Sequence, residues 1–321
     1  MLSENLIEVE NLKHYFPIRG GIFSKTISHI HAVDYVSLSI KKGETFGLVG
    51  ESGCGKTTFG RCVLMLLRPE GSILFDGKDL TQLKKEELRK LRVQMSMIFQ
   101  DPFSSLNPKK TVSDIVGQPL DIHKISKGRE KEKMVAGILE MVGLRKDHIY
   151  RYPHEFSGGQ KQRIGIARAI AVNPKFIVAD EAVAALDVSI KADILNLLKK
   201  LQTDLDLTYL FISHDLSVVK YICDTVAVMY LGKVVEIGAK DIIFNEPLHP
   251  YTQALISAIP IPDPTVKRER IILPGSVPTP IDPPPGCRFF SRCQYATSKC
   301  SKFEPELIES RPGHFVACHR I

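Results

Sequence analysis

Apolar and polar residues alternate in short runs over residues 6–50, as in LIEVENL, VSLSI and TFGLVG. Alternation that is rich in β-branched residues predicts strands, which here lead into a glycine-rich loop. Two later runs, FIVAD at 176–180 and TYLFIS at 208–213, are almost continuously apolar and end at a polar residue. Such runs predict strands that are buried on both faces of a parallel sheet.

Helical periodicity takes over between these strands. Helices are predicted after Gly55, in the charged stretch near Glu86, and over residues 129–142, 158–171 and 189–202. The last of these carries a core stripe at helical spacing, formed by Ile190, Ile194, Leu197, Leu198 and Leu201. Alternating strands and helices predict an α/β fold with a parallel sheet, which binds its ligands at the carboxyl ends of the strands.

Length and composition set broad limits. The length of 321 residues predicts one large domain with an appendage, or two domains. The sequence contains no internal repeat, which argues against two nucleotide domains in one chain. The net charge of +7 is spread through short mixed runs, so it favours anionic ligands only weakly. The first residues lack a secretion signal, and no apolar run approaches the roughly 20 residues needed to cross a bilayer. We therefore expect a soluble, cytoplasmic protein that can sit on a membrane partner.

A glycine-rich loop follows the strand TFGLV and precedes a helical pattern, which is the context of a P-loop. Its backbone amides are expected to cradle phosphates. Lys56 would neutralise the β- and γ-phosphates, and Thr57 would place its hydroxyl on Mg²⁺. A chance glycine-rich turn is the alternative, but strand, loop, Lys-Thr and helix in register argue against it. The expected nucleotide-binding residues are Gly50, Ser52, Gly53, Cys54, Gly55, Lys56, Thr57 and Thr58.

Polar residues at the ends of three strands form a candidate catalytic group. Asp180 is expected to bind Mg²⁺ through water, and Glu181 to orient and deprotonate the attacking water. His214, after LFIS, would reach the γ-phosphate, and Gln100, after MIF, would sense Mg²⁺ and the attacking water. Acidic turn residues and a structural histidine are the plainer alternatives. The P-loop favours the catalytic interpretation.

Ser157-Gly158-Gly159-Gln160 opens the helix predicted over residues 158–171. One interpretation is a capping box, in which the Ser157 and Gln160 side chains satisfy backbone amides at the helix start. That does not account for two glycines, each of which costs about 1 kcal/mol in a helix relative to alanine. Bare amides at the positive end of a helix bind anions. The motif therefore predicts a second phosphate-binding element.

The motifs GESGCGKTT, FQ before DP, FSGGQKQR, FIVADE, ALD and ISHD occur in a characteristic order and spacing. Through them residues 6–237 resemble the nucleotide-binding subunit of an ABC transporter. FQDPFSSLNP, HPYTQAL and DPPPGCRFFSRC extend the resemblance to the ATP-binding subunits of oligopeptide and dipeptide importers. The resemblance implies a P-loop NTPase of the ABC type, with a parallel core sheet, an antiparallel β-subdomain and an α-helical subdomain, plus a small C-terminal cysteine module.

The expected domains are an ABC nucleotide-binding domain over residues 1–236, with its helical subdomain at about 101–172, a helical and proline-rich connector over 237–285, and a four-cysteine module over 286–321. The proline-rich stretch LPGSVPTPIDPPPG predicts that this connector is stiff and extended. By the resemblance, segment 101–155 would offer a groove to a cytoplasmic helix of a membrane permease.

The resemblance also implies a head-to-tail dimer that sandwiches two ATPs, each between the P-loop of one subunit and the SGGQ motif of the other. Ser157 and Gly159 would contact the γ-phosphate of the partner's ATP, and Asp187 of the D-loop would link the two sites. Phe16 or Tyr15 would stack on adenine, with Phe16 favoured by its offset from the motif. An aromatic side chain in the core is the alternative.

By the same resemblance, ATP hydrolysis with Mg²⁺ drives conformational change in two integral membrane permease subunits at the cytoplasmic face of the membrane. The other expected partners are a second, non-identical ABC ATPase subunit and an extracytoplasmic peptide-binding protein, with no nucleic acid. One rival is a soluble ABC ATPase of DNA repair or translation, which typically carries duplicated cassettes, coiled-coil insertions or zinc fingers. Another is an iron–sulfur redox protein with incidental nucleotide binding, which the set of Asp180, Glu181 and His214 argues against.

Ala182 and Ala184 depart from the family pattern DEPVSALD, which has proline and serine there. Glu181 is retained, so hydrolysis stays feasible. Loss of the serine hydroxyl near the dimer interface puts the communication between the two sites in doubt. Phe156, in place of the commoner leucine before SGGQ, is a mild apolar change.

Seven cysteines divide into two groups. Cys54, Cys62 and Cys223 lie in apolar segments and are expected to pack as small hydrophobic residues. The other four are separated by five, six and seventeen residues, wider than the ligand pairs of zinc modules. A [4Fe-4S] cluster, which the resemblance implies, is the main expectation, with zinc, disulfides or an empty structural site as alternatives. His314 or His319 would replace a cysteine in a zinc site. The expected metal ligands are Cys287, Cys293, Cys300 and Cys318.

Overall fold

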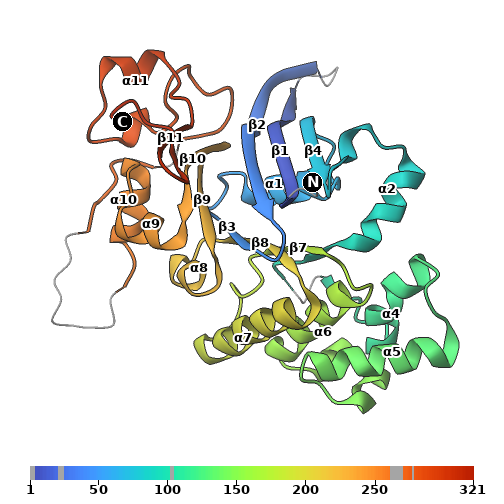
Figure 1. Cartoon of the computed structure of the whole chain (residues 1–321). Helices are drawn as coiled ribbons and strands as arrows, with labels where there is room; N and C mark the ends of the chain where they lie inside the picture. Colours follow the sequence, from blue (N-terminus) through green and yellow to red (C-terminus); the bar gives the residue numbers. More distant parts are fainter. Residues whose placement is uncertain (1–3, 21–24, 102–104, 261–269, 277) are drawn as a thin grey trace. The chain divides into compact units, whose positions relative to one another are not determined.

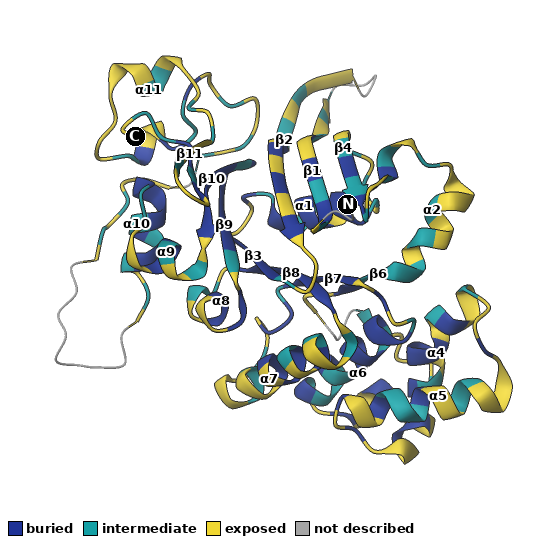
Figure 2. Ribbon diagram, viewed as in Figure 1, coloured by how far each residue is buried: buried dark blue, intermediate teal, exposed yellow. Residues whose placement is uncertain are grey.

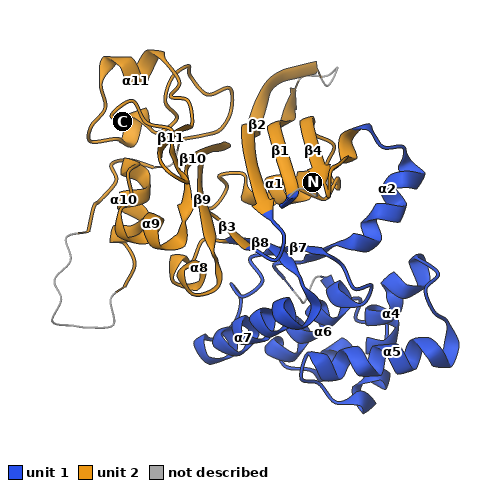
Figure 3. Cartoon of the chain, in the orientation of Figure 1, with its two compact units in different colours: residues 1–6, 41–44, 82–212 blue, residues 7–40, 45–81, 213–321 orange. Residues whose placement is uncertain are grey.

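A computed structural model describes residues 4–20, 25–101, 105–260, 270–276 and 278–321 (Figure 1). The chain forms two compact units, which Figure 3 distinguishes by colour. Unit 1 comprises residues 1–6, 41–44 and 82–212, and unit 2 comprises residues 7–40, 45–81 and 213–321.

Parallel strands form the centre of unit 1. β6 (Met95–Ile98) pairs with β7 (Phe176–Asp180), and β7 pairs with β8 (Thr208–Ser213), all in parallel. Every residue of β7 and β8 is buried, as the continuous apolar runs predict (Figure 2). Both predicted strands are therefore confirmed.

Helices make up most of the rest of unit 1, and α4, α5 and α6 pack against one another. The predicted helices are confirmed to within a few residues at each end. α4 escaped prediction because Pro119 lies inside it and interrupts the usual helical pattern; Thr111 caps its start by accepting from the Asp114 amide. The helices are α2 (Lys85–Leu91), α4 (Val112–Ile122), α5 (Gly128–Met141), α6 (Gly158–Ile170) and α7 (Val188–Leu205), with 3₁₀ turns η2 (Arg92–Gln94), η3 (Lys146–Tyr150) and η4 (Pro153–Glu155).

The N-terminal part of unit 2 is a four-stranded sheet in the order β2-β1-β4-β5. β1 (Asn5–Gly20) runs antiparallel to β4 (Glu70–Phe75), which continues through a tight turn into β5 (Lys78–Asp79). β2 (Lys25–Lys41) alternates exposed and buried residues over its second half, as expected for a strand with one face on the core.

A second group of paired strands in unit 2 joins the phosphate-loop strand to the chain's C-terminal region. β3 (Thr45–Val49) is parallel to β9 (Thr225–Tyr230), whereas β9, β10 (Lys233–Ala239), β12 (His314–Val316) and β11 (Ile308–Arg311) pair antiparallel in that order. The C-terminal cysteine segment thus adds two strands, β12 and β11, next to β10 of unit 2. The helices of unit 2 are α1 (Lys56–Val63), α8 (Leu216–Ile222), α9 (Lys240–Asn245), α10 (Pro250–Ser257) and α11 (Ser298–Lys302), with 3₁₀ turns η1 (Leu80–Gln82) and η5 (Phe290–Arg292).

Some predicted features lie partly outside the described residues. Outside the described residues lie 102–104 of the FQDPFSSLNP segment, and 261–269 and 277 of the proline-rich connector. None of the helices in the described ranges combines the length and apolar content that crossing a bilayer requires.

Candidate nucleotide-binding site

The glycine-rich loop of unit 2 connects β3 to α1. Gly55 has a φ of 112°, and a Cβ there would lie 1.9 Å from the carbonyl oxygen of Ala32, so only glycine fits. Gly55 is also the N-cap of α1 and offers no side chain to the first amides of the helix. A helix start of this kind is suited to phosphate oxygens.

Lys56 is buried, and its ammonium donates to the carbonyl oxygens of Gly50 at 2.8 Å and Glu51 at 2.9 Å. The backbone carbonyls at the start of the loop therefore hold the lysine side chain within the loop. Ser52 and Gly53 are exposed, whereas Gly55, Thr57 and Thr58 are partly exposed. Cys54 is buried, as are Cys62 and Cys223, which confirms their expected role as small core residues.

Asp180 ends β7 in unit 1, and Glu181 follows it directly. Asp180 is 3% exposed, while the next residue, Glu181, adopts a φ of 45° and donates its backbone amide to Ile212 at 2.9 Å. A left-handed backbone is uncommon for glutamate and concentrates at functional sites. The Gln100 amide donates to the Glu181 carboxylate at 2.7 Å. The structure thus brings two predicted catalytic residues together at adjacent strand ends.

The SGGQ motif forms the predicted capping box at the start of α6. The Gln160 amide donates to the Ser157 hydroxyl at 3.3 Å, and the Ser157 amide donates to the Gln160 side chain at 3.0 Å. Gly159 has a packing reason as well, because a Cβ there would lie 2.6 Å from Cγ2 of Ile190 on α7. Packing within the chain therefore accounts for one of the two glycines. The exposed Ser157, and Asp187 at the N-cap of α7, keep their phosphate and D-loop roles as predictions.

Tyr15 and Phe16 of β1 have different surroundings in unit 2. Tyr15 donates to the Asp34 carboxylate and stacks on His31 with ring centroids 3.8 Å apart. Burial and the Asp34 hydrogen bond raise the pKa of Tyr15. Phe16 is 37% exposed and touches only the edge of His14 among the ring contacts of the described residues. Phe16 is thus the more available of the two for a flat ligand.

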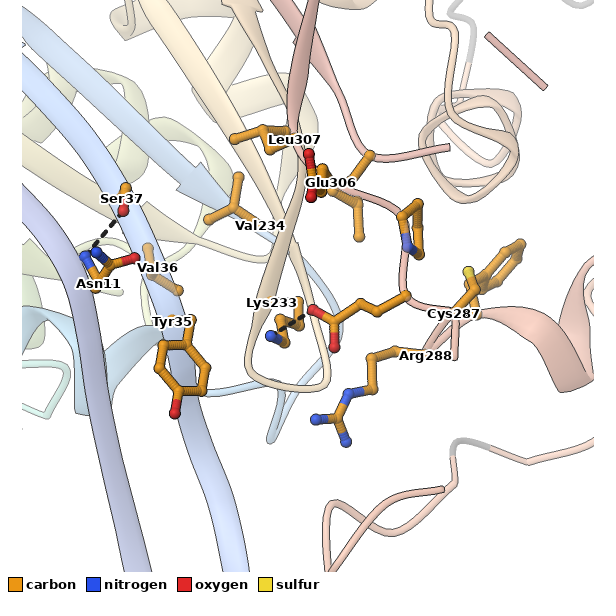
Figure 4. A pocket seen from close by; sticks show the side chains of 15 residues that line it. Asn11, Tyr35, Val36, Ser37, Lys233, Val234, Cys287, Arg288, Glu306 and Leu307 are labelled. Atoms are coloured by element: carbon orange, nitrogen blue, oxygen red, sulfur yellow. Dashed lines mark hydrogen bonds and ion pairs between the residues drawn. The ribbon is translucent and has the colours of Figure 1, made fainter. Parts of the chain in front are cut away.

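Asp34 is a buried carboxylate, 2% exposed, that joins β2 to the C-terminal region. Burial alone would raise its pKa, but the hydrogen bond from Tyr15 and the charges of Lys233 and Arg288 lower it instead. Lys233 lies 3.3 Å from the Asp34 carboxylate, and Arg288 donates to it directly. Figure 4 shows Arg288, Lys233 and Cys287 at an adjoining pocket of about 500 Å³.

His214 lies between β8 and α8 in unit 2 and is exposed. The residue after it, Asp215, caps α8 by accepting from the amides of Ser217 at 3.1 Å and Val218 at 3.4 Å. A predicted catalytic side chain is therefore carried by a turn that the following cap holds in place.

The four C-terminal cysteines lie in one module, where the Cys287 amide donates to the Cys300 carbonyl at 2.8 Å. Burial raises the pKa of Cys287 to about 11, and the thiols of Cys300, Cys318 and Cys293 add to the rise. However, no three or more histidine, cysteine or acidic side chains among the described residues are arranged to hold a metal ion. The thiols as placed do not fit the predicted [4Fe-4S] cluster or a zinc ion.

The two histidines considered as zinc ligands are engaged elsewhere. His314 is fully buried, with Nε2 2.8 Å from the Glu236 carboxylate, and His319 Nε2 lies 2.9 Å from the Phe303 carbonyl oxygen. These contacts give no support to either histidine as a replacement for a cysteine at a metal, and among the described residues neither belongs to a metal-holding group.

Sequence reasoning missed a group of residues that fasten the C-terminal region to the loop. Glu51 donates its backbone amide to the Tyr251 hydroxyl at 2.9 Å, and its carboxylate accepts from Arg292 at 2.7 Å. Glu236 accepts from the amides of Leu248 and His249 at the start of α10. The segment HPYTQAL was the available signal, but it indicated a family and not these contacts.

Comparison with known proteins gives matches along the whole chain. A family model described as "ABC transporter" matches residues 33–184, and one described as "Oligopeptide/dipeptide transporter, C-terminal region" matches residues 235–300. The oligopeptide transport ATP-binding protein AppF of Bacillus subtilis (strain 168) is 53% identical over 99% of this chain and 98% of its own length. The putative oligopeptide transport ATP-binding protein YkfD of the same strain is 51% identical, over 98% and 95%.

Solved structures agree with these matches. CbiO1 of Clostridium perfringens, part of the ABC transporter complex cbiONQ, is 29% identical with a TM-score of 0.65 and covers 76% of this chain and 92% of its own. A dimeric ATP-binding cassette bound to ADP and phosphate in a post-hydrolysis state is 30% identical with a TM-score of 0.65, covering 73% and 98%.

Proposed function

Because this chain belongs to the family of ATP-binding subunits of oligopeptide and dipeptide ABC transporters, we propose that it powers the import of peptides. The chain is an ABC ATPase. The predicted fold class is confirmed: an ABC-type P-loop NTPase with parallel core strands, an antiparallel β-subdomain and a helical subdomain. The observation that carries the peptide proposal is the 53% identity to an oligopeptide transport ATP-binding protein over nearly the whole of both chains.

The proposed catalytic roles follow the sequence motifs. Glu181 activates the attacking water, Gln100 and Asp180 serve Mg²⁺ with the Thr57 hydroxyl, and His214 contacts the γ-phosphate. The short Gln100–Glu181 contact and the left-handed backbone of Glu181 support this assignment. The P-loop binds the phosphates, and Phe16, rather than the engaged Tyr15, stacks on adenine.

The proposed assembly has two ATPase subunits and two permease subunits at the cytoplasmic face of the membrane, supplied by an extracytoplasmic peptide-binding protein. In it Ser157, Gly158, Gly159 and Gln160 face the ATP of the partner subunit, and Asp187 lies at the interface. The names of the curated relatives support a peptide transporter and do not favour the alternative of a soluble ABC ATPase of DNA repair or translation.

The proposed domains are the cassette over residues 1–236, with its helical subdomain at 101–172, the connector over 237–285 and the four-cysteine module over 286–321. Support for a [4Fe-4S] cluster in that module comes from the cysteine pattern and the family resemblance, since the described thiols form no metal site. The iron content of the purified protein tests it.

Glu181→Gln is the direct test of the function. We expect ATP turnover to fall at least about a hundredfold, because a general base contributes that much or more, while ATP binding is retained. In cells whose only copy carries the substitution, uptake of a labelled oligopeptide should stop while uptake of a labelled amino acid continues.

Phe16→Ser tests the adenine contact. In the same ATP-binding assay, this variant is expected to bind ATP more weakly.

Glu86→Gln is the matched control, because Glu86 is an exposed glutamate on α2. Unchanged ATP hydrolysis in Glu181→Gln would place the general base elsewhere. Lost turnover with normal peptide uptake would reject the transported class while leaving the ATPase assignment intact.

A further inference from the structure

Glu51 places a carboxylate in the phosphate loop, immediately before Ser52. A negative charge there opposes the binding of a nucleotide triphosphate unless something neutralises it. Arg292 provides the opposite charge, with Nη1 2.7 Å from the Glu51 carboxylate. The side chain of Arg292 is 8% exposed and that of Glu51 is 26% exposed, so water screens this pair less than a surface ion pair.

The Glu51 backbone is held from two further directions. Its amide donates to the Tyr251 hydroxyl at 2.9 Å, and its carbonyl accepts from the Lys56 ammonium at 2.9 Å. The phosphate-binding lysine, the loop glutamate and two residues of the C-terminal region therefore form one connected network. A change at Arg292 reaches Lys56 through a single residue.

Arg292 is itself positioned by the packing of its segment. Phe289 is 1% exposed and lies against the rings of Tyr230, Tyr251 and His249 at centroid distances of 5.3, 5.4 and 5.7 Å. The turn η5 follows directly and ends at Arg292, next to Cys293. On the other side of Phe289, Arg288 donates to the buried Asp34 carboxylate, which also accepts from Tyr15.

We propose that Arg292 is a positioning residue of the phosphate loop: it neutralises and orients Glu51, and so makes ATP affinity depend on the four-cysteine module that carries it. The proposal assigns this module a role in nucleotide binding and needs no metal. It rests on the chain's being an ATP-binding subunit, and the experiment below separates the two claims.

The experiment measures equilibrium binding of Mg²⁺ with a slowly hydrolysed ATP analogue to the full-length chain. Arg292→Met keeps much of the apolar stem and removes the charge, and we expect about tenfold weaker binding. Arg292→Lys should recover part of the loss. Glu51→Gln combined with Arg292→Met should return the affinity to within about threefold of the unsubstituted chain, because no charge is then left to neutralise.

Arg311→Met is the matched control, because Arg311 lies in the same module and pairs with Glu246 in an exposed ion pair. It should bind the analogue within twofold of the unsubstituted chain. Glu51→Gln alone keeps Arg292 and serves if Arg292→Met does not fold; it should bind at least as tightly as the unsubstituted chain and with a stronger dependence on salt.

Three results would overturn the proposal. The first is unchanged affinity in a folded Arg292→Met variant, and the second is a loss that the double variant does not recover, which would indicate a purely structural role. The third is weaker binding in Glu51→Gln. Absence of nucleotide binding in the unsubstituted chain would instead contradict the ATP-binding assignment itself.

Discussion

Single side chains in this protein are defined by the backbone and burial around them. The catalytic role proposed for Glu181 is supported by its positive φ directly after the strand that Asp180 ends, and by the Gln100 amide that donates to its carboxylate. Tyr15 and Phe16 are neighbours of similar size, yet a hydrogen bond to Asp34 engages one and leaves the other exposed. Residue type alone predicts neither difference.

His249 allows a test of burial at the residue scale. Burial lowers its pKa to about 3, so between about pH 6.5 and 3 the unfolded chain binds a proton at this position that the folded chain does not. Stability from this group is therefore full above pH 6.5 and falls as the pH drops. Lowering the pH from 7.5 to 5.5 should cost about 1.4 kcal/mol through this residue.

Urea denaturation at both pH values measures the effect. His249→Asn keeps a side chain able to cap α10 and should lose this part of the pH dependence, whatever its stability at pH 7.5. His154→Asn, at an exposed histidine, should retain it. An identical pH dependence in His249→Asn and the unsubstituted chain would show that His249 is not held neutral.

Elements in this protein meet where a small residue permits it. α6 begins with the capping box that the sequence predicts, and α7 places Ile190 against Gly159 in its first turn. The core stripe of α7 is confirmed for Ile194, Leu197, Leu198 and Leu201, which are buried, whereas Ile190 is partly exposed. Ile190 contributes a contact between helices at the motif and not part of the buried stripe.

Gly159→Ala and Gly165→Ala form a matched pair on α6. Alanine at 159 would meet Ile190 Cγ2 at 2.6 Å, and we expect a destabilisation of about 1–3 kcal/mol. Alanine at 165 has no atom within 4 Å of its Cβ and should stabilise the helix by up to about 1 kcal/mol.

Thermal and urea unfolding distinguish the two variants. Adding Ile190→Ala to Gly159→Ala should relieve the clash and recover part of the loss. Equal stability of Gly159→Ala and Gly165→Ala would show that packing does not require glycine at position 159, and would leave phosphate binding as its explanation.

At the scale of the whole molecule, the predicted catalytic residues come from both units. The P-loop and His214 belong to unit 2, whereas Asp180, Glu181, Gln100 and the SGGQ motif belong to unit 1. The C-terminal cysteine segment belongs to unit 2. It adds strands β11 and β12 next to β10, and its Arg292 contacts Glu51 of the phosphate loop. The segment is therefore an integral part of unit 2, which contains the phosphate loop.

Metal analysis tests the cluster proposal for the intact chain. After anaerobic purification a [4Fe-4S] protein contains about four iron atoms per chain and is brown. Removing iron with a chelator should bleach it, and Cys300→Ser should lower the iron content. A colourless, iron-free protein would reject the cluster and leave the module held by its buried contacts, such as the His314–Glu236 pair.

The sequence by itself determined the buried strands FIVAD and TYLFIS, the helices of unit 1 apart from α4, the P-loop, the acidic strand end and the capping box, because each depends on local periodicity or on residues close in the chain. It could not decide which of Tyr15 and Phe16 is free, why Gly159 is glycine, or that Arg292 pairs with Glu51, a contact between residues 241 positions apart. Its SGGQ motif predicts contact with a partner's phosphate, and the fold of the chain adds the packing of Gly159 against Ile190. Only folding brings side chains such as Arg292 and Glu51 together, because they are distant in the chain. Only burial makes a carboxylate such as Asp34 depend on charged partners, because it removes the carboxylate from water.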